Sequence, residues 1–122
     1  MSGTKILIVD DEPIMRESLG GWLERDGHDV DKAPSGEEAL EKLEKTRYDI
    51  LLVDIKMEGM SGLDLLKRVK ENDPDVDVVM ITAYGSIPSS IEAMKNGAYD
   101  YLLKPFDPNE LGKKKKKIVE RQ

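Results

Sequence analysis

Apolar and polar residues follow two different periods along this chain. Short, mostly apolar runs of the length of a buried strand occur at Lys5–Val9, 28–33, Ile50–Asp54, 76–82 and 99–104. The run at 28–33 alternates between apolar and polar residues, so we expect it at an edge of a sheet with one wetter face. Between the runs, apolar residues recur every three or four positions, as on one face of a helix. This alternation predicts βα units around a parallel sheet.

Capping and stop residues mark the expected helices. Pro13 opens the first helix and Gly27 should end it, while Ser35 followed by Glu38 is the capping-box pattern of the second. Pro108 would stand in the first turn of a fifth helix. The residues expected on the inner faces of the second, third and fourth helices share helical spacing: Ala39, Leu40, Leu43, Leu63, Leu66, Val69, Ile87, Ile91 and Met94.

Five strands and five helices account for the whole chain, which we expect to be one domain over residues 1–122. The segments between the strands are long enough for right-handed crossovers. We therefore predict a doubly wound α/β fold, a five-stranded parallel sheet with helices on both faces. The carboxyl ends of its strands would lie at one edge, where ligands bind in such sheets.

Composition narrows the function classes. The chain has no cysteine, which excludes disulfides and thiolate metal sites. Its net charge is −6, and five of its bases form the single run Lys113–Lys117, so the rest is more acidic still. An acidic body argues against direct nucleic-acid binding by the domain. No apolar run is long enough to span a membrane and no leader suggests export, so we expect a cytoplasmic protein.

Polar residues that carry chemistry stand where the expected strands end. Asp10 and Asp11 follow the first strand, Asp54 ends the third, Thr82 the fourth and Lys104 the fifth. Clustered carboxylates repel one another, and a hard divalent cation bound through oxygen relieves this, so we expect Mg²⁺. No glycine-rich phosphate loop is present, so we expect no nucleotide cofactor. One phosphoryl group would suit this charge pattern.

Four motifs, at 8–12 (IVDDE), 52–57 (LVDIKM), 81–83 (ITA) and 103–106 (LKPF), carry a resemblance to a known family. Together they resemble the response-regulator receiver domain, the phospho-acceptor half of two-component signalling, over nearly the whole chain. The resemblance implies a flavodoxin-like sheet in the order 2-1-3-4-5. Residues 92–101 (EAMKNGAYDY) further resemble receivers of enhancer-binding transcription activators of the nitrogen-regulator kind.

The resemblance implies a role for each acid at the strand ends. Asp54 would be the nucleophile that takes a phosphoryl group from the phosphohistidine of a sensor histidine kinase or phosphotransfer protein. Asp11 and Asp54 would hold Mg²⁺ directly, together with the backbone carbonyl of Lys56. Asp10 would act through a metal-bound water. The domain would thus be a phospho-acceptor switch and not a turnover enzyme.

The resemblance also implies a switching apparatus. Thr82 and Lys104 would contact phosphoryl oxygens, and Tyr101 stands at the family's switch-aromatic position. The output surface would be the face formed by the fourth helix, fifth strand and fifth helix, which would contact an output domain or a second copy. An effector domain absent from this chain would regulate transcription.

Several positions depart from the family pattern. Glu58 and Ser61 replace common loop residues, and residues 88–90 are unusual for the start of the fourth helix. The run Lys113–Lys117 interrupts the apolar stripe expected of the fifth helix, so we expect that helix to be weak or partly detached. We interpret the run as a solvated segment and not as a nucleic-acid site.

Other interpretations stay open at this stage. The acids after the first strand could simply favour a helix start, and Tyr101 could be an ordinary core residue. A haloacid-dehalogenase-like phosphatase also uses a strand-end aspartate with Mg²⁺, but it needs an acid two residues later, where this chain has Lys56. A flavodoxin-like binding module would share the sheet, yet it gives no reason for the acids and the lysine.

Overall fold

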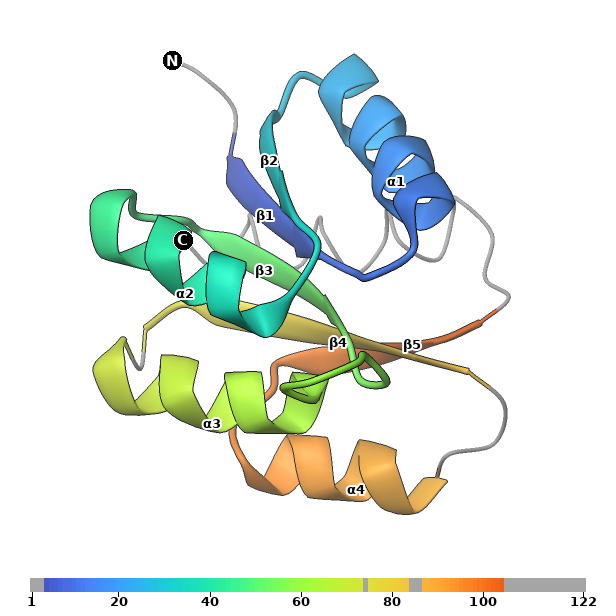
Figure 1. Ribbon diagram of the computed structural model, residues 1–122, viewed down its shortest axis with the longest axis vertical. Coiled ribbons are helices and arrows are strands. Elements are labelled where there is room, and N and C mark those ends of the chain that lie inside the picture. Colours follow the sequence, from blue (N-terminus) through green and yellow to red (C-terminus); the bar gives the residue numbers. More distant parts are fainter. Residues whose placement is uncertain (1–3, 74, 84–86, 105–122) are drawn as a thin grey trace.

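The computed structural model describes residues 4–73, 75–83 and 87–104, which form a single α/β layer structure (Figure 1). Strands and helices alternate along the chain as expected. Their bounds are β1 Lys5–Val9, α1 Pro13–Arg25, β2 Asp29–Ala33, α2 Gly36–Lys45, β3 Ile50–Asp54, α3 Gly62–Asn72, β4 Asp77–Ala83, α4 Ile87–Lys95 and β5 Asp100–Lys104. The fifth helix predicted from Pro108, and with it the run Lys113–Lys117, lies outside the described residues.

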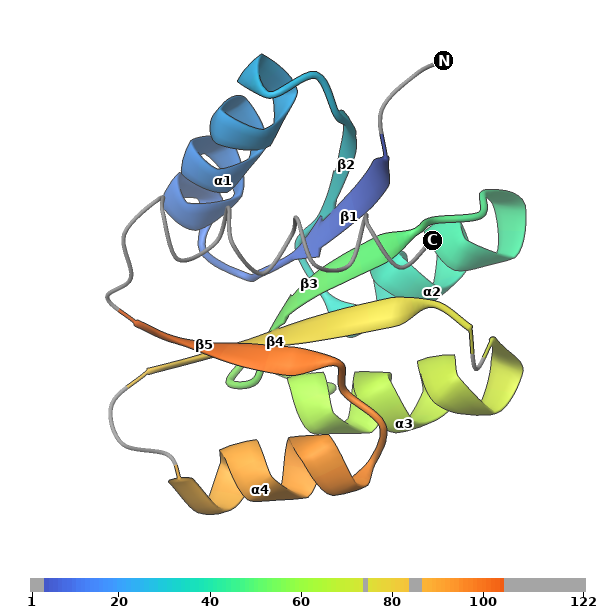
Figure 2. The ribbon, with the colours of Figure 1, turned by 180° about the vertical axis from the view of Figure 1, so that it is seen from behind.

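All five strands are parallel and lie in the order β2-β1-β3-β4-β5, which confirms the predicted sheet. Figures 1 and 2 show α2, α3 and α4 on one face of the sheet and α1 on the other. Among the described helices, none combines the length and apolar character that a membrane crossing would need. The sheet is thus doubly wound, and its strand ends meet at one edge.

The central strands are apolar on both sides because both of their faces are covered. All five residues of β3 are buried. Leu51 and Val53 belong to the core under α2 and α3, and Ile50 and Leu52 to the core under α1. β2 is an edge strand in which only Ala33 is buried, as its alternating sequence predicted.

Local signals place the helix ends correctly. The hydroxyl of Ser35 accepts a hydrogen bond from the backbone N–H of Glu38 (3.2 Å), and the hydroxyl of Ser61 accepts one from Asp64 (3.2 Å). Each bond satisfies an N–H group that the first turn of a helix leaves unpaired. Gly27 follows α1 with φ +91°, a conformation that favours glycine.

The predicted inner face of α4 was wrong. Ile91 and Met94 are 52% and 43% exposed, whereas Ala93 is fully buried in the core under α2 and α3. α4 carries apolar residues on more than one side, so spacing alone does not decide which side faces the sheet. In α3 the shift is smaller: Leu65 is fully buried, while Leu63 is only partly covered.

Candidate functional site

Two aspartates meet at the carboxyl edge of the sheet. β1 pairs with β3 so that Val9 lies opposite Val53, which brings the next residues, Asp10 and Asp54, to neighbouring strand ends. Both are buried, with 0% and 5% exposure. Buried carboxylates are rare in proteins unless they are paired, hydrogen-bonded or bound to a metal. Their position agrees with the one expected from the strand ends.

Glu12 joins the two aspartates, although the sequence assigned it no role. One carboxylate oxygen each of Asp10, Glu12 and Asp54 lies within 4.8 Å of the others. Glu12 is exposed and stands at the N-cap of α1. The only signal in the sequence was that a third acid follows Asp10 and Asp11. That signal does not say which of the three side chains turns toward Asp54.

Asp11 takes a different place from Asp10 and Glu12. It is not part of this carboxylate group, and its Oδ2 accepts a hydrogen bond from the backbone N–H of Glu58 (3.3 Å) in the loop after β3. In the same loop, the backbone N–H of Lys56 donates to Oδ1 of Asp54 (3.2 Å). The loop that follows the predicted acceptor is therefore attached to two of the acids.

Gly62 is a second residue whose role sequence reasoning missed. It is the buried first residue of α3. Its N–H donates to the carbonyl of Ile55 (2.8 Å), and a Cβ added there would lie 2.1 Å from the carbonyl oxygen of Asp54. Only a residue without a side chain lets α3 begin this close to the main chain of Asp54.

Thr82 and Lys104 come from the ends of β4 and β5. Asp54 pairs with Ile81, and Lys104 pairs with Ala83, so the backbones of both predicted residues reach the edge that carries Asp54. Their side chains lie outside what the structure describes. Tyr101 is half-buried and packs against the core under α2 and α3.

The three clustered carboxylates offer the oxygen atoms that Mg²⁺ prefers. Two ligands on opposite sides of an octahedral Mg²⁺ are about 4.2 Å apart, because each bond is about 2.1 Å long. Oxygens within 4.8 Å of one another can share one cation once the side chains move inward. Without a cation, several negative charges stand at close range, and like charges disfavour one another. The donor set fits a hard divalent cation.

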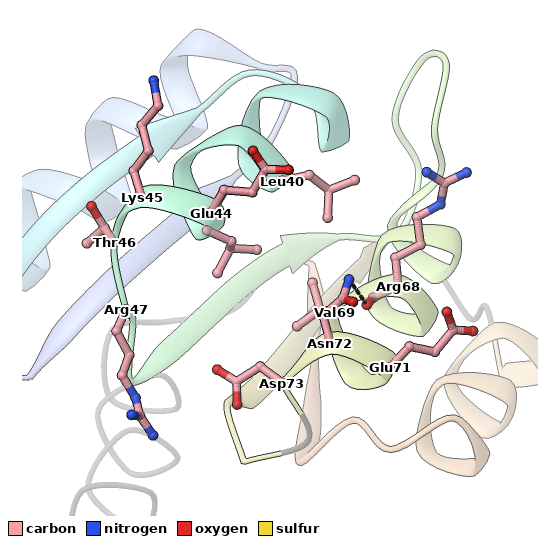
Figure 3. A pocket seen from close by; sticks show the side chains of 11 residues that line it. Leu40, Glu44, Lys45, Thr46, Arg47, Arg68, Val69, Glu71, Asn72 and Asp73 are labelled. Carbon is pink, nitrogen blue, oxygen red and sulfur yellow. Dashed lines mark hydrogen bonds between the residues drawn. The ribbon is translucent and has the colours of Figure 1, made fainter.

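A groove lies at the opposite edge of the sheet, between the C-terminal halves of α2 and α3 (Figure 3). Its apolar lining is Leu40, Leu43 and Val69, and charged side chains of both signs surround it. None of its lining residues belongs to the acid cluster. The groove therefore adds nothing to the site at the carboxyl edge.

Comparison with known proteins agrees with this geometry. The family described as "Response regulator receiver domain" matches residues 6–116. The chain belongs to this family. It is a receiver domain of two-component phosphorelays, a phospho-acceptor signalling module and not a classical enzyme.

Individual relatives point to transcription regulators. The chain is 41% identical to the transcriptional regulatory protein ZraR of Klebsiella oxytoca over 91% of its own length, and 45% identical to the response regulator protein PilR of Pseudomonas aeruginosa over 88%. It spans 26% and 24% of those proteins. Among solved structures, the receiver domain of NtrX from Brucella abortus superposes with a TM-score of 0.92 at 33% identity, covering 96% of this chain and 99% of that one. The expected likeness to nitrogen-regulator-type enhancer-binding regulators is confirmed.

Proposed function

We propose that Asp54 is the residue that accepts the phosphoryl group, taken from a phosphohistidine of a sensor histidine kinase or phosphotransfer protein. The observation that carries this proposal is the convergence of Asp10, Glu12 and Asp54 at the end of the central strand of a receiver fold. In the transfer, a bond forms between a carboxylate oxygen of Asp54 and phosphorus while the phosphorus–nitrogen bond of the donor breaks. Asp54 suits this role because it is the last residue of the central strand β3.

Mg²⁺ is part of the proposal, and the donor set described above supports it. Asp54 and the backbone carbonyl of Lys56 would hold the ion, and Asp10 would act through a bound water. Asp11 would also hold it, after turning from the N–H of Glu58 toward Asp54. Glu12 is close enough to Asp10 and Asp54 to add a carboxylate. When bound, the ion supplies positive charge that offsets the carboxylates and the phosphoryl oxygens. The N–H of Lys56 donates to one oxygen of Asp54 and helps to orient its carboxylate.

The switching residues follow from the same proposal. Thr82 would donate its hydroxyl to a phosphoryl oxygen, and Lys104 would pair with another, because both stand near the carboxyl ends of β4 and β5, at the sheet edge that carries Asp54. Tyr101 would respond from β5. Phosphorylation adds roughly −1.5 to −2 charges, which act at a distance only by biasing an element that has two arrangements.

The output and the partners are also proposals. ZraR and PilR are about four times longer than the part that this chain matches, so we place an effector domain that regulates transcription beside the receiver. The contact face would be α4, β5 and the fifth helix, and the exposed Ile91 and Met94 of α4 support it. The same face would serve a homodimer. A regulator of transcription would act in the cytoplasm.

Phosphorylation by a small donor tests the assignment of Asp54. Incubation with acetyl phosphate and Mg²⁺ should add one phosphate per chain, detected by intact mass spectrometry, and Asp54→Asn should abolish it. Asp64→Asn is the matched control, since Asp64 is an exposed acid in the first turn of α3 that is near the site in sequence but not part of the cluster. Excess chelator should suppress labelling in the parent chain.

Three results would contradict the proposal. One is a labelled Asp54→Asn chain, which would put the acceptor elsewhere. Another is undiminished labelling under chelator, which would remove Mg²⁺ from the mechanism. Continuous release of phosphate from a small phosphomonoester would instead favour a phosphatase.

A further inference from the structure

Arg16 reaches back from α1 to the turn that carries the acids. Its Nη1 donates to the main-chain carbonyl of Asp10 at 2.6 Å, and its own backbone N–H donates to the carbonyl of Glu12 at 3.2 Å. It therefore bonds to both ends of the three-residue turn, once through the guanidinium and once through the main chain. A hydrogen bond from a charged donor is stronger than one between neutral groups.

The start of α1 explains why this turn needs such a bond. α2 and α3 are capped by Ser35 and Ser61, but the N-cap of α1 is Glu12, whose side chain makes no capping hydrogen bond. The carboxylate of Glu12 instead lies with those of Asp10 and Asp54. The usual side-chain cap of a helix start is thus not used at α1. The turn is held instead by the bond from the Arg16 guanidinium to the carbonyl of Asp10, together with a bond from the Glu12 N–H to Oδ1 of Asp10.

Other bonds hold Asp10 itself. Its backbone N–H donates to the carbonyl of Ala33 (3.2 Å), and its Oδ1 accepts from the backbone N–H of Glu12 (2.9 Å). Its main-chain carbonyl is the acceptor of the Arg16 guanidinium. The guanidinium of Arg16 is permanently charged, which strengthens its hydrogen bond to this carbonyl. These bonds together fix the main chain and the side chain of Asp10, and with them the position of its carboxylate.

We propose that Arg16 is a positioning residue of the acid site: it fixes the turn from Asp10 to Glu12 so that these carboxylates and that of Asp54 converge on one cation. The inference rests on the proposed function, because it assigns the convergence to cation binding. Groups behind the ligands of a metal site typically change metal affinity by about 10- to 100-fold when they are removed. Arg16 does not touch the cation or the phosphoryl group.

Magnesium titration of three variants tests this role. Isothermal titration calorimetry of the whole chain with MgCl₂ gives Kd, and urea unfolding in chelator gives the stability of the metal-free chain. Arg16→Gln removes the charge and shortens the reach, and it should raise Kd about tenfold. Arg16→Lys keeps the charge but loses the planar fork, and it should raise Kd about threefold.

Arg25→Gln is the matched control. Arg25 also lies on α1 and also donates to a main-chain carbonyl, that of Gly21 (3.2 Å), but it stands nine residues, about 13 Å, farther along the helix. Its Kd should stay within about twofold of the parent value. The control separates a local effect on the acid turn from a general weakening of α1.

The outcomes are distinct. If Arg16→Gln binds Mg²⁺ with the Kd of the parent chain, the proposal is overturned. This holds even if the metal-free variant is less stable, because the residue is then only structural. If Arg16→Gln does not fold, a parent Kd retained by Arg16→Lys overturns it as well. If the parent chain binds no Mg²⁺, both the proposed function and this inference are refuted. If the parent chain binds Mg²⁺ and the Arg16 variants bind it with the same Kd, only this inference is refuted.

Discussion

Replacing Gly62 by alanine should destabilise the fold, because the added methyl group meets main-chain atoms and not a movable side chain. The methyl carbon would lie 2.1 Å from the carbonyl oxygen of Asp54 and 2.7 Å from the Cα of Ile55. Both atoms belong to the buried end of β3 and the residue after it. Relief of the overlap therefore requires the start of α3 to move away from the sheet.

The size of the effect follows from these distances. Ordinary contact begins at 3.4 Å, so the first turn of α3 must retreat by about 1.3 Å. The hydrogen bond from Gly62 to Ile55, now 2.8 Å, would then be broken. Overpacking costs about 1–3 kcal/mol and the broken bond about 1 kcal/mol, while the better helix propensity of alanine offsets up to about 1 kcal/mol. We expect a net loss of about 1–3 kcal/mol in the free energy of unfolding.

Gly36→Ala is the matched control for this measurement. Gly36, like Gly62, is the first residue of a helix capped by serine, but its added methyl group would meet Sδ of Met60 at 2.8 Å. The sulfur is at the far end of a flexible side chain and can turn away at little cost, while Cβ of Met60, at 3.1 Å, needs a shift of only a few tenths of an ångström. Urea unfolding followed by circular dichroism gives both free energies. Since helix propensity and capping are the same at the two positions, the difference measures the clash with the main chain.

Equal stability of the two variants would refute this reasoning. If Gly62→Ala and Gly36→Ala agree within about 0.5 kcal/mol, α3 can shift without loss, and its close approach to Asp54 is not a constraint. A loss confined to Gly36→Ala would reverse the argument and make Met60 the rigid neighbour.

Three further predictions test other parts of the molecule. Burial and the hydrogen bond to Asp31 raise the pKa of the Tyr48 hydroxyl, so above a pH of about 10 the unfolded chain loses this proton before the folded chain does. The free energy of unfolding should therefore fall as the pH rises, and it should fall less in Tyr48→Phe. Urea titrations of both chains at a pH of about 8 and about 11 measure this difference. Leu65→Ala should lower the free energy of unfolding by about 2–5 kcal/mol and Leu63→Ala by roughly half as much or less, because only Leu65 is fully buried; similar losses would contradict the observed face of α3. Lys104→Ala should unfold at nearly the same urea concentration as the parent chain, yet incorporate phosphate at least about tenfold more slowly. If the variant is unfolded without urea, the lysine has a structural role instead.

The sequence alone determined the parts of the fold that depend on local chemistry. β1 and β3 begin and end at the expected residues because a strand covered on both faces is apolar along its covered length, which leaves the unbroken runs that end at Val9 and Val53. The capping bond from the N–H of Glu38 to the hydroxyl of Ser35 joins residues three apart, so its pattern is complete within one turn. The acids at the strand ends were found in the same way, since Asp10 and Asp54 follow directly on these runs. The order of the strands came from resemblance to a family, because no local pattern selects it.

Tertiary structure alone decided which residues meet. Ile91 and Met94 have the spacing of an inner face, but the packing of α4 beside α3 places Ala93 against the core and leaves both larger residues exposed. The approach of Glu12 to Asp54, and of Gly62 to the main chain of Asp54, depends on how closely separate segments pack. Such distances depend on the register of the sheet and on how the helices pack against it, and the periodicity of a single segment determines neither.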